Sequence, residues 1–504
     1  MKSTLNFLAS GHLRGRATGT PESEVTVAYL ASVFERNGLS PVANSETGFL
    51  QTFPLVHSLP LESSRCAIEN EEGNWEPLQF GTDYLPAPWG AEAEEITEEV
   101  VVAGYGLNAP EQHYSDYDGL RVEGKLVAFF SKVPVARDDR FKQFSKEDLE
   151  DPFSKVLEAQ RRGALAALII LADGEEMPYK DASSIDKSKL YLKDEVDAIR
   201  IPTLFLTARA AEKLVRPSGA PEQRKLADIK KRLDETLQPV DLVRGRRLLL
   251  ETHYQRRANR GHNVVGLLPG SDVRLRDQYI LIGAHHDHIG VSDQEVIFYG
   301  ADDDASGTAA LLELSYAFST NPVRPKRSVV FAAWGAEEIG LFGSKYYVHH
   351  PLVPLDKTVA MIQMDMVGRN EDRGSDPSNK YPPEKPESNG NSVNAIGGPF
   401  SQGLKSLLQL KNERIGLDIR FRYDFDYENL IKRSDHWPFL KERVPAILLF
   451  TGFHPDYHKS TDTADKINYP KLQKITRLVY LVAWDLADQR ETPEFHEQPS
   501  KTMF

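Results

Sequence analysis

The sequence of 504 residues contains a single cysteine, Cys66. One thiol excludes an intramolecular disulfide framework and a metal site built from several thiolates. Long apolar runs are also missing, since no stretch of 18 or more apolar residues occurs, and this argues against a membrane span. Positive charge is in deficit, and the net charge of −13 argues against a partner held through nucleic-acid phosphates.

The first residues, Met1–Leu8, lack the apolar core of a signal peptide. Two hypotheses for the compartment follow. The protein is cytoplasmic if no signal peptide was ever present, and secreted or periplasmic if one was removed. The composition, 40% hydrophobic and 27% charged, is typical of a soluble globular protein with a substantial core. The length is about three times that of an ordinary domain, which favours two domains.

The pattern of strands and helices changes at about residues 60 and 245, which divides the chain into residues 1–59, an inserted region at residues 60–244, and residues 245–504. The inserted region has short β-type runs separated by turn residues, and we expect it to be β-rich with a few helices. From about residue 245, strands and helices alternate, which predicts an α/β fold with a mostly parallel sheet covered by helices on both faces. The candidate buried strands are Asn263–Leu268, Tyr279–Gly283, Ser328–Trp334, Thr358–Met364 and Ala446–Phe450.

Two helices are predicted with specific features. Thr20 is a candidate N-cap with Pro21 at the first helical position of the N-terminal helix. A second helix, Ser306–Phe318, has an apolar face that includes Leu312 and Tyr316.

Polar side chains follow four of the predicted strands, at the sheet edge where ligands bind in open α/β folds. They are His285–His288, Glu337-Glu338, Asp365 and His454–His458, and the triple carboxylate Asp302–Asp304 lies between the first two. Each alone has an ordinary structural explanation, such as a helix cap or a buried core histidine. Their joint occurrence at one edge predicts a metal site.

The ligand types indicate which metal this site would hold. Imidazole and carboxylate without thiolate suit zinc, with cobalt or manganese as alternatives. The ligands exceed what one tetrahedral ion needs, and they fit two ions roughly 3.5–4 Å apart that share a carboxylate and a water. Adjacent side chains at a strand end point differently, so one of Glu337 and Glu338 can bind metal while the other accepts a proton.

Six segments resemble, in order and spacing, the motifs of metallopeptidase family 28, the clan MH group of co-catalytic zinc aminopeptidases and glutamate carboxypeptidases. The segments are Gly283–Gly290, Gly300–Gly307, Trp334–Gly340, Asp365–Gly368, Ser434–His436 and Asp456–Thr463. Leu13–Thr20 resembles the entry segment of the family, which implies a discontinuous catalytic domain, residues 1–59 and 245–504, interrupted by an inserted domain, residues 60–244. The inserted region resembles a protease-associated (PA) domain through Gly104–Gly106, Asp116-Tyr117 and Gly124-Lys125.

The resemblance implies two zinc ions per chain and a role for each matching residue. His285 and Asp365 would bind one zinc, Glu338 and His458 the other, and Asp303 would bridge the two.

It also implies the catalytic groups. Glu337 would be the general base and then acid, Asp287 would orient His285, and Tyr457 would help to hold the oxyanion. Asp302 and Asp304 would support the loop, and neither His286 nor His288 is given a metal role.

The implied function is that of a metallo-exopeptidase, an aminopeptidase that cleaves N-terminal residues from a peptide substrate through a metal-bridging hydroxide. Three alternatives stay open. They are a carboxypeptidase or dipeptidase of the same fold, a one-zinc enzyme resembling glutaminyl cyclases, and a non-enzymatic, receptor-like relative. The inserted domain would be either a lid over the zinc site or a stabilising module. Side-chain preference and oligomeric state are left open.

Overall fold

A computed structural model describes residues 1–42, 48–70, 72–110, 113–133, 151–178, 190–214, 226–236, 246–373, 384–424 and 430–497. The chain forms two compact units, Met1–Phe53 with Arg260–Gln498 and Pro54–Ala182 with Lys189–Asn259. The division falls inside two long strands, β2 and β14, which run from one unit into the other. Because these strands are continuous there, the sequence carries no boundary signal, and the predicted limits at 59/60 and 244/245 differ from the observed division.

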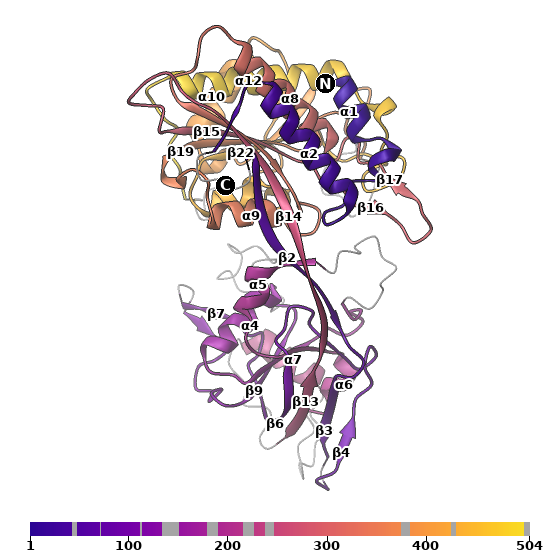
Figure 1. Ribbon diagram of the computed structural model, residues 1–504. Coiled ribbons are helices and arrows are strands. Elements are labelled where there is room, and N and C mark those ends of the chain that lie inside the picture. The colour runs from indigo at the N-terminus through magenta and orange to yellow at the C-terminus, as the bar shows by residue number, and fades with distance from the viewer. Residues whose placement is uncertain are drawn as a thin grey trace. The chain divides into compact units, whose positions relative to one another are not determined.

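The first unit is built on a mixed sheet whose centre is four parallel strands, in the order β18, β15, β19 and β22. Three of these strands, β15, β19 and β22, are labelled in Figure 1. Strand β14 pairs antiparallel with β18, and β20 pairs antiparallel with β22. This confirms the predicted α/β class with a mostly parallel central sheet. The strands of this unit are β1 (Ser40–Pro41), β2 (Leu50–Pro60), β14 (Tyr254–Leu268), β15 (Tyr279–His285), β18 (Ser328–Trp334), β19 (Thr358–Met364), β20 (Ser392–Ile396), β21 (Asp418–Arg420) and β22 (Ala446–Phe450).

The central strands are buried on both faces because helices cover each side. Alternate residues of β15 show this: Ile280 and Ile282 pack in one core, and Leu281 packs in the other. The helices of the first core are α1 (Lys2–Leu8), α2 (Pro21–Arg36), α8 (Ala305–Thr320), α10 (Gln402–Asn412) and α12 (Tyr469–Asp488). The helices of the second core are α9 (Phe342–His349) and α11 (His436–Lys441).

The predicted start of α2 is confirmed, because the Thr20 side chain accepts a hydrogen bond from the Ser23 amide and Pro21 is the first helical residue. The predicted apolar face of α8 is partly wrong. Leu312 is buried, but the Tyr316 side chain is 55% exposed. The small Ser315 turns inward instead, where its hydroxyl oxygen lies 2.8 Å from Asn37 Nδ2. No described helix, the 20-residue α12 included, is long and apolar enough to cross a membrane.

Short elements connect the main ones in this unit. They are β16 (Gly290–Val291), β17 (Ile297–Phe298) and the 3₁₀ helices η1 (Gly11–Leu13), η4 (Leu355–Lys357), η5 (Gly398–Phe400), η6 (Leu430–Lys432) and η7 (Ala464–Lys466).

The second unit has its own sheet, in the order β4-β3-β13-β6-β9-β10-β12-β5. Its strands are β3 (Arg65–Glu69), β4 (Trp75–Pro77), β5 (Tyr84–Pro86), β6 (Ala93–Val102), β7 (Asn108–Ala109), β8 (Tyr114–Ser115), β9 (Leu126–Phe130), β10 (Ala166–Ile170), β11 (Leu190–Leu192), β12 (Thr203–Leu206) and β13 (Arg247–Thr252). Its helices are α4 (Pro152–Arg161), α5 (Lys193–Ala198), α6 (Ala208–Glu212) and α7 (Leu226–Thr236). The unit is β-rich, as expected.

One buried carboxylate organises the Gly104–Gly106 turn of this unit. Asp116 accepts hydrogen bonds from the amides of Tyr105 and Leu107, both at 3.0 Å, and from the Tyr114 hydroxyl at 2.5 Å. Asp116 and the Gly104–Gly106 segment, which suggest a PA domain in the sequence, therefore stabilise a turn in the structure. The PA assignment itself stays a prediction.

Candidate metal centre

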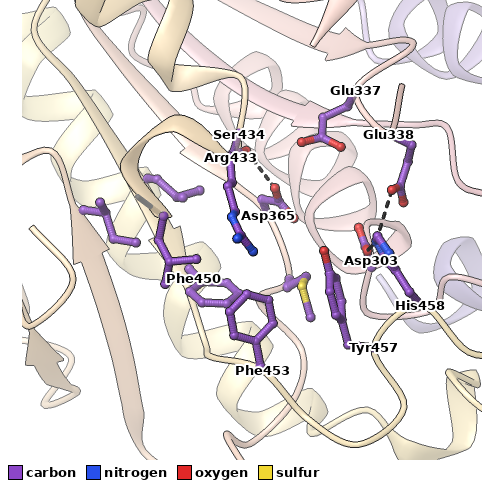
Figure 2. A pocket seen from close by; sticks show the side chains of 14 residues that line it. Asp303, Glu337, Glu338, Asp365, Arg433, Ser434, Phe450, Phe453, Tyr457 and His458 are labelled. Atoms are coloured by element: carbon purple, nitrogen blue, oxygen red, sulfur yellow. Dashed lines mark hydrogen bonds and ion pairs between the residues drawn. The ribbon is translucent and has the colours of Figure 1, made fainter. Parts of the chain in front are cut away.

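The carboxyl ends of the central parallel strands and the loop before α8 deliver polar side chains to one pocket of the first unit (Figure 2). His285 is the last residue of β15, Asp365 directly follows β19, and Glu337 follows β18. The polar lining of the pocket consists of Asp303, Glu337, Glu338, Asp365, Arg433, Ser434, Tyr457 and His458. The structure thus brings together the residues to which the sequence assigns metal binding, although these side chains lie as many as 173 positions apart in the chain, from His285 to His458.

Asp303 lies between two imidazole–carboxylate pairs. Its Oδ1 is 3.1 Å from His285 Nε2, which in turn is 3.5 Å from Asp365 Oδ1. Its Oδ2 is 3.2 Å from His458 Nε2, which is 3.1 Å from Glu338 Oε2. Each oxygen of Asp303 therefore faces its own pair, which is the arrangement that a bridging carboxylate requires.

The cluster fits divalent cations. Both ring nitrogens of His285 are buried without a hydrogen bond, and ligand atoms of His285, Asp303 and Glu338 lie within 4.8 Å of one another. Burial lowers the pKa of His458, but contacts with Asp303 and Glu338 outweigh burial and raise this pKa to about 10. Cation binding would displace the proton from that imidazole. Nitrogen and oxygen donors without sulfur suit zinc.

Asp304 also comes within 4.8 Å of His285 and Asp365 through its ligand atoms. Its oxygens are already occupied, however. Oδ1 accepts the amides of Gly307 and Met366, at 2.9 and 3.1 Å, and Oδ2 accepts the His285 amide at 3.1 Å. Asp304 is therefore the N-cap of α8 and ties three segments together, which leaves Asp303 as the better placed ligand.

The third carboxylate of the run, Asp302, faces away from both. Its Oδ1 accepts the Gly368 amide at 2.6 Å, and its Oδ2 is 3.3 Å from His454 Nε2. The amides of Asp302 and Asp303 both donate to Asp462 Oδ2, at 2.9 and 3.3 Å. Three consecutive carboxylates coexist because each has different partners.

Glu337 lines the pocket with its Oε2 3.9 Å from His285 Nε2. Burial raises the pKa of Glu337 well above its ordinary value, and repulsion from Asp365 and Glu338 adds to the shift. A carboxylate whose pKa is raised toward neutrality can accept a proton and return it. This environment is compatible with the predicted role of general base and acid.

Asp287 lies beside His285 but does not hydrogen-bond to it, since its Oδ1 is 3.7 Å from His285 Nδ1. The carboxylate instead accepts the Glu337 amide at 3.1 Å and the Thr18 hydroxyl at 3.2 Å. Thr18 Oγ1 in turn accepts the Ala336 amide at 3.0 Å. Asp287 thus holds the turn that carries Glu337. Its predicted role of orienting His285 would act through the electrostatic attraction across 3.7 Å, without a hydrogen bond.

Tyr457 lies in the pocket with its ring stacked on that of His458, at 3.8 Å between ring centroids. Burial raises the pKa of the Tyr457 hydroxyl, and the negative charges of Asp303 and Glu338 add to the shift. The hydroxyl therefore stays protonated and can donate a hydrogen bond to an oxyanion.

Three residues at the site were not assigned a role from the sequence. The buried His288, expected to have no metal role, lies with its Nδ1 2.5 Å from Glu338 Oε1 and so orients this carboxylate. The Ser434 hydroxyl donates to Asp365 Oδ2 at 2.7 Å. The buried Arg16 donates to the carbonyl oxygens of Gly300 and Asp303, at 2.7 and 3.2 Å. The signal for Ser434 and Arg16 was their position inside motifs that the sequence already singles out.

The remaining wall of the pocket is apolar. It is formed by Met366, Ile396, Leu430, Leu448, Phe450 and Phe453. Phe450 and Phe453 contact each other with ring centroids 5.1 Å apart. The site therefore combines a charged edge with a wall that can receive an apolar side chain.

Comparison with known proteins places this geometry in context. Residues 263–483 match the model of peptidase family M28. The chain is 26% identical over 254 residues to leupeptin-inactivating enzyme 1 of Streptomyces exfoliatus, covering 46% of this chain and 50% of that protein. It is 26% identical over 241 residues to aminopeptidase YwaD of Bacillus subtilis, covering 46% of each. The matches thus span half or less of these curated relatives.

A solved structure shows the fold over the whole chain. The aminopeptidase from Aneurinibacillus sp. strain AM-1 superimposes with a TM-score of 0.51 at 19% sequence identity, covering 100% of this chain and 95% of that one. At 19% identity, this likeness shows the fold alone.

Proposed function

We propose that this chain, whose residues 263–483 form a domain of peptidase family M28, is a two-zinc metallo-exopeptidase that acts as an aminopeptidase. One observation carries the proposal: Asp303 is flanked by two imidazole–carboxylate pairs at the edge of a pocket with an apolar wall. The carboxypeptidase and dipeptidase alternatives share this centre and differ in how the substrate is held.

Each residue has one task in the proposed reaction. His285 with Asp365, and His458 with Glu338, would hold the two ions, and Asp303 would contact both. Two bound zinc ions would supply an acidified water and polarise the scissile carbonyl.

The protein groups around the ions move the proton and hold the charge. Glu337 would take a proton from the attacking water and deliver it to the leaving amine, for which its raised pKa suits it. The protonated Tyr457 hydroxyl would donate to the oxyanion.

Two features support action at the amino terminus. Glu337 lines the pocket and is not assigned to an ion, so its carboxylate could pair with a free α-ammonium group. Two of the proteins that the chain resembles, from Bacillus subtilis and Aneurinibacillus, are named aminopeptidases. The inserted unit would be a PA-like domain.

The proposal is tested by separating metal binding from turnover. Glu337→Gln should retain two zinc ions per chain by elemental analysis and lose at least about a thousandfold in kcat on aminoacyl substrates, because it removes the proton acceptor but no ligand. His458→Ala is the matched contrast and should lose one of the two ions. Wild-type-like turnover of Glu337→Gln, or two ions retained by His458→Ala, would contradict the assignment.

The amino-terminal specificity has its own comparison. Wild-type protein should cleave aminoacyl substrates with a free α-amine and leave N-blocked ones intact, and a chelator should abolish cleavage. Cleavage of N-blocked peptides with a free C-terminus would instead identify a carboxypeptidase.

A further inference from the structure

Arg433 is the one arginine among the residues that line the metal-centre pocket. It follows η6, and Figure 2 shows its side chain extending into the pocket that Asp365, Phe450 and Tyr457 also line. Its side chain is exposed, unlike the buried Asp303 and Asp365 of the same pocket. A permanent positive charge therefore lies beside a pocket that is also lined by four carboxylates and an apolar wall.

The guanidinium group of Arg433 makes no ion pair or hydrogen bond with any residue that the structure describes. Other arginines of the same unit are paired: Arg369 lies 2.9 Å from Asp456, and Arg422 lies 2.8 Å from Glu384. The nearest acidic group in sequence is not available either, because Asp435 accepts hydrogen bonds elsewhere. Among the residues that the structure describes, Arg433 is thus without a partner beside the proposed metal centre.

The backbone that carries Arg433 is nevertheless held in place. Its amide donates to the Leu430 carbonyl at 3.1 Å, and the next residue, Ser434, donates to Asp365 Oδ2 at 2.7 Å. Asp435 is buried and accepts from Ser344 Oγ at 2.6 Å and from Gln363 Nε2 at 3.1 Å. These contacts define where the Arg433 backbone lies relative to the metal ligands. The five N–H donors of its side chain are not used by any residue that the structure describes.

The pocket favours one kind of ligand for these donors. A planar guanidinium binds a carboxylate through two parallel hydrogen bonds, and the interaction strengthens where apolar groups exclude water. The buried side chains of Ile396, Leu448 and Phe450 provide such a wall in the same pocket.

We propose that Arg433 is a specificity-determining residue that binds a carboxylate of the peptide substrate. The inference rests on the proposed exopeptidase function and names the substrate class for it. The carboxylate has two sources: the side chain of an N-terminal Asp or Glu, or the free C-terminus of a short peptide.

Two matched peptide pairs distinguish these sources. Glu-Gly amide and Gln-Gly amide differ in the side-chain carboxylate, and Leu-Gly and Leu-Gly amide differ in the C-terminal one. In the zinc-loaded protein, Arg433→Gln should lower kcat/KM about tenfold for the charged member of one pair, through KM, and leave the uncharged members unchanged. The pair that responds identifies the source.

The control variant is Arg414→Gln, which removes the same charge from an exposed position after α10 that does not line the pocket. It should change no substrate by more than about twofold, since an exposed charge outside the pocket is screened by solvent and salt. An equal effect of both variants would show that only net charge matters, and would overturn the proposal.

A binding measurement gives a readout independent of turnover. In a Glu337→Gln background, calorimetry with the same four peptides should show a preference for one charged peptide that Arg433→Gln removes. Equal losses for charged and uncharged peptides, or no change in any, would overturn the role of Arg433. If the wild-type protein hydrolyses none of the four peptides while the binding preference is present, the proposed function fails and the carboxylate site stands.

Discussion

Replacement of the buried Arg16 should be among the most damaging single changes in the chain. Its guanidinium donates to five carbonyl oxygens, and none of its hydrogen bonds goes to a carboxylate. The acceptors and distances are Leu8 at 3.1 Å, His286 at 2.9 Å, Tyr299 at 2.7 Å, Gly300 at 2.7 Å and Asp303 at 3.2 Å. Arg16→Met keeps the length of the side chain and removes every donor.

The magnitude follows from these contacts. Each buried acceptor left without a donor costs roughly 1–3 kcal/mol. The Gly300 oxygen keeps the Ala305 amide at 3.3 Å, and relaxation or entering water satisfies part of the rest. The variant also loses a positive charge that lowers the electrostatic cost of Asp303, Asp304 and Asp287. We therefore expect a loss of about 3–5 kcal/mol in the free energy of unfolding.

Urea denaturation of the metal-free protein measures this loss, and Arg14→Met is the control. Arg14 is 42% exposed and pairs with Glu295 at 2.7 Å, so its removal should cost far less than that of Arg16, because water screens an exposed ion pair. Zinc affinity of Arg16→Met should fall as well, because the carbonyl of Asp303 loses its anchor. A loss below 1 kcal/mol for Arg16→Met, or equal losses for the two variants, would refute the reasoning.

Two further predictions concern residues around the centre. Ser434→Ala removes the donor to Asp365 Oδ2 and should weaken zinc binding about tenfold to a hundredfold in a competition assay with a chromophoric chelator; unchanged affinity would contradict it. Burial raises the pKa of Asp456, but Lys466, Thr461 and Arg369 outweigh burial and hold this pKa below its ordinary value. Asp456→Asn should therefore cost about 1 kcal/mol at pH 7. The difference should shrink as the pH falls below about 3.9, because the unfolded carboxyl becomes protonated there while the folded one is still ionised; a constant difference in urea titrations would argue against it.

The strands of the catalytic unit could be predicted closely because their signal is local. Strands β18, β19 and β22 coincide with the predicted ranges, since each is a mostly apolar run that is followed by a glycine or a polar residue. Strand β15 extends two residues further than expected and includes His285, which pairs with Trp334 of β18. In the sequence, the polar His285 indicates that the strand has ended. In the structure, His285 is still a residue of β15 and pairs with the neighbouring strand.

The partners of each carboxylate could not be predicted, because they come from distant parts of the chain. Asp302, Asp303 and Asp304 are adjacent in the sequence, yet they face His454, two metal-site histidines and backbone amides. His288 shows the same limit: strand alternation ends at His285, so no periodicity indicates that His288 turns back toward Glu338.

The charge of the cluster argues for two cations over one. Asp303, Glu338 and Asp365 bring three negative charges into a site where their side chains are 5%, 7% and 12% exposed. A single divalent ion leaves an excess negative charge there, and a buried excess charge is costly. Two divalent ions would balance the negative charge of these carboxylates and of Glu337, and would supply a positive centre for a substrate carbonyl. A one-zinc site of the kind found in glutaminyl cyclases needs only one imidazole–carboxylate pair, and here each oxygen of Asp303 faces a pair of its own.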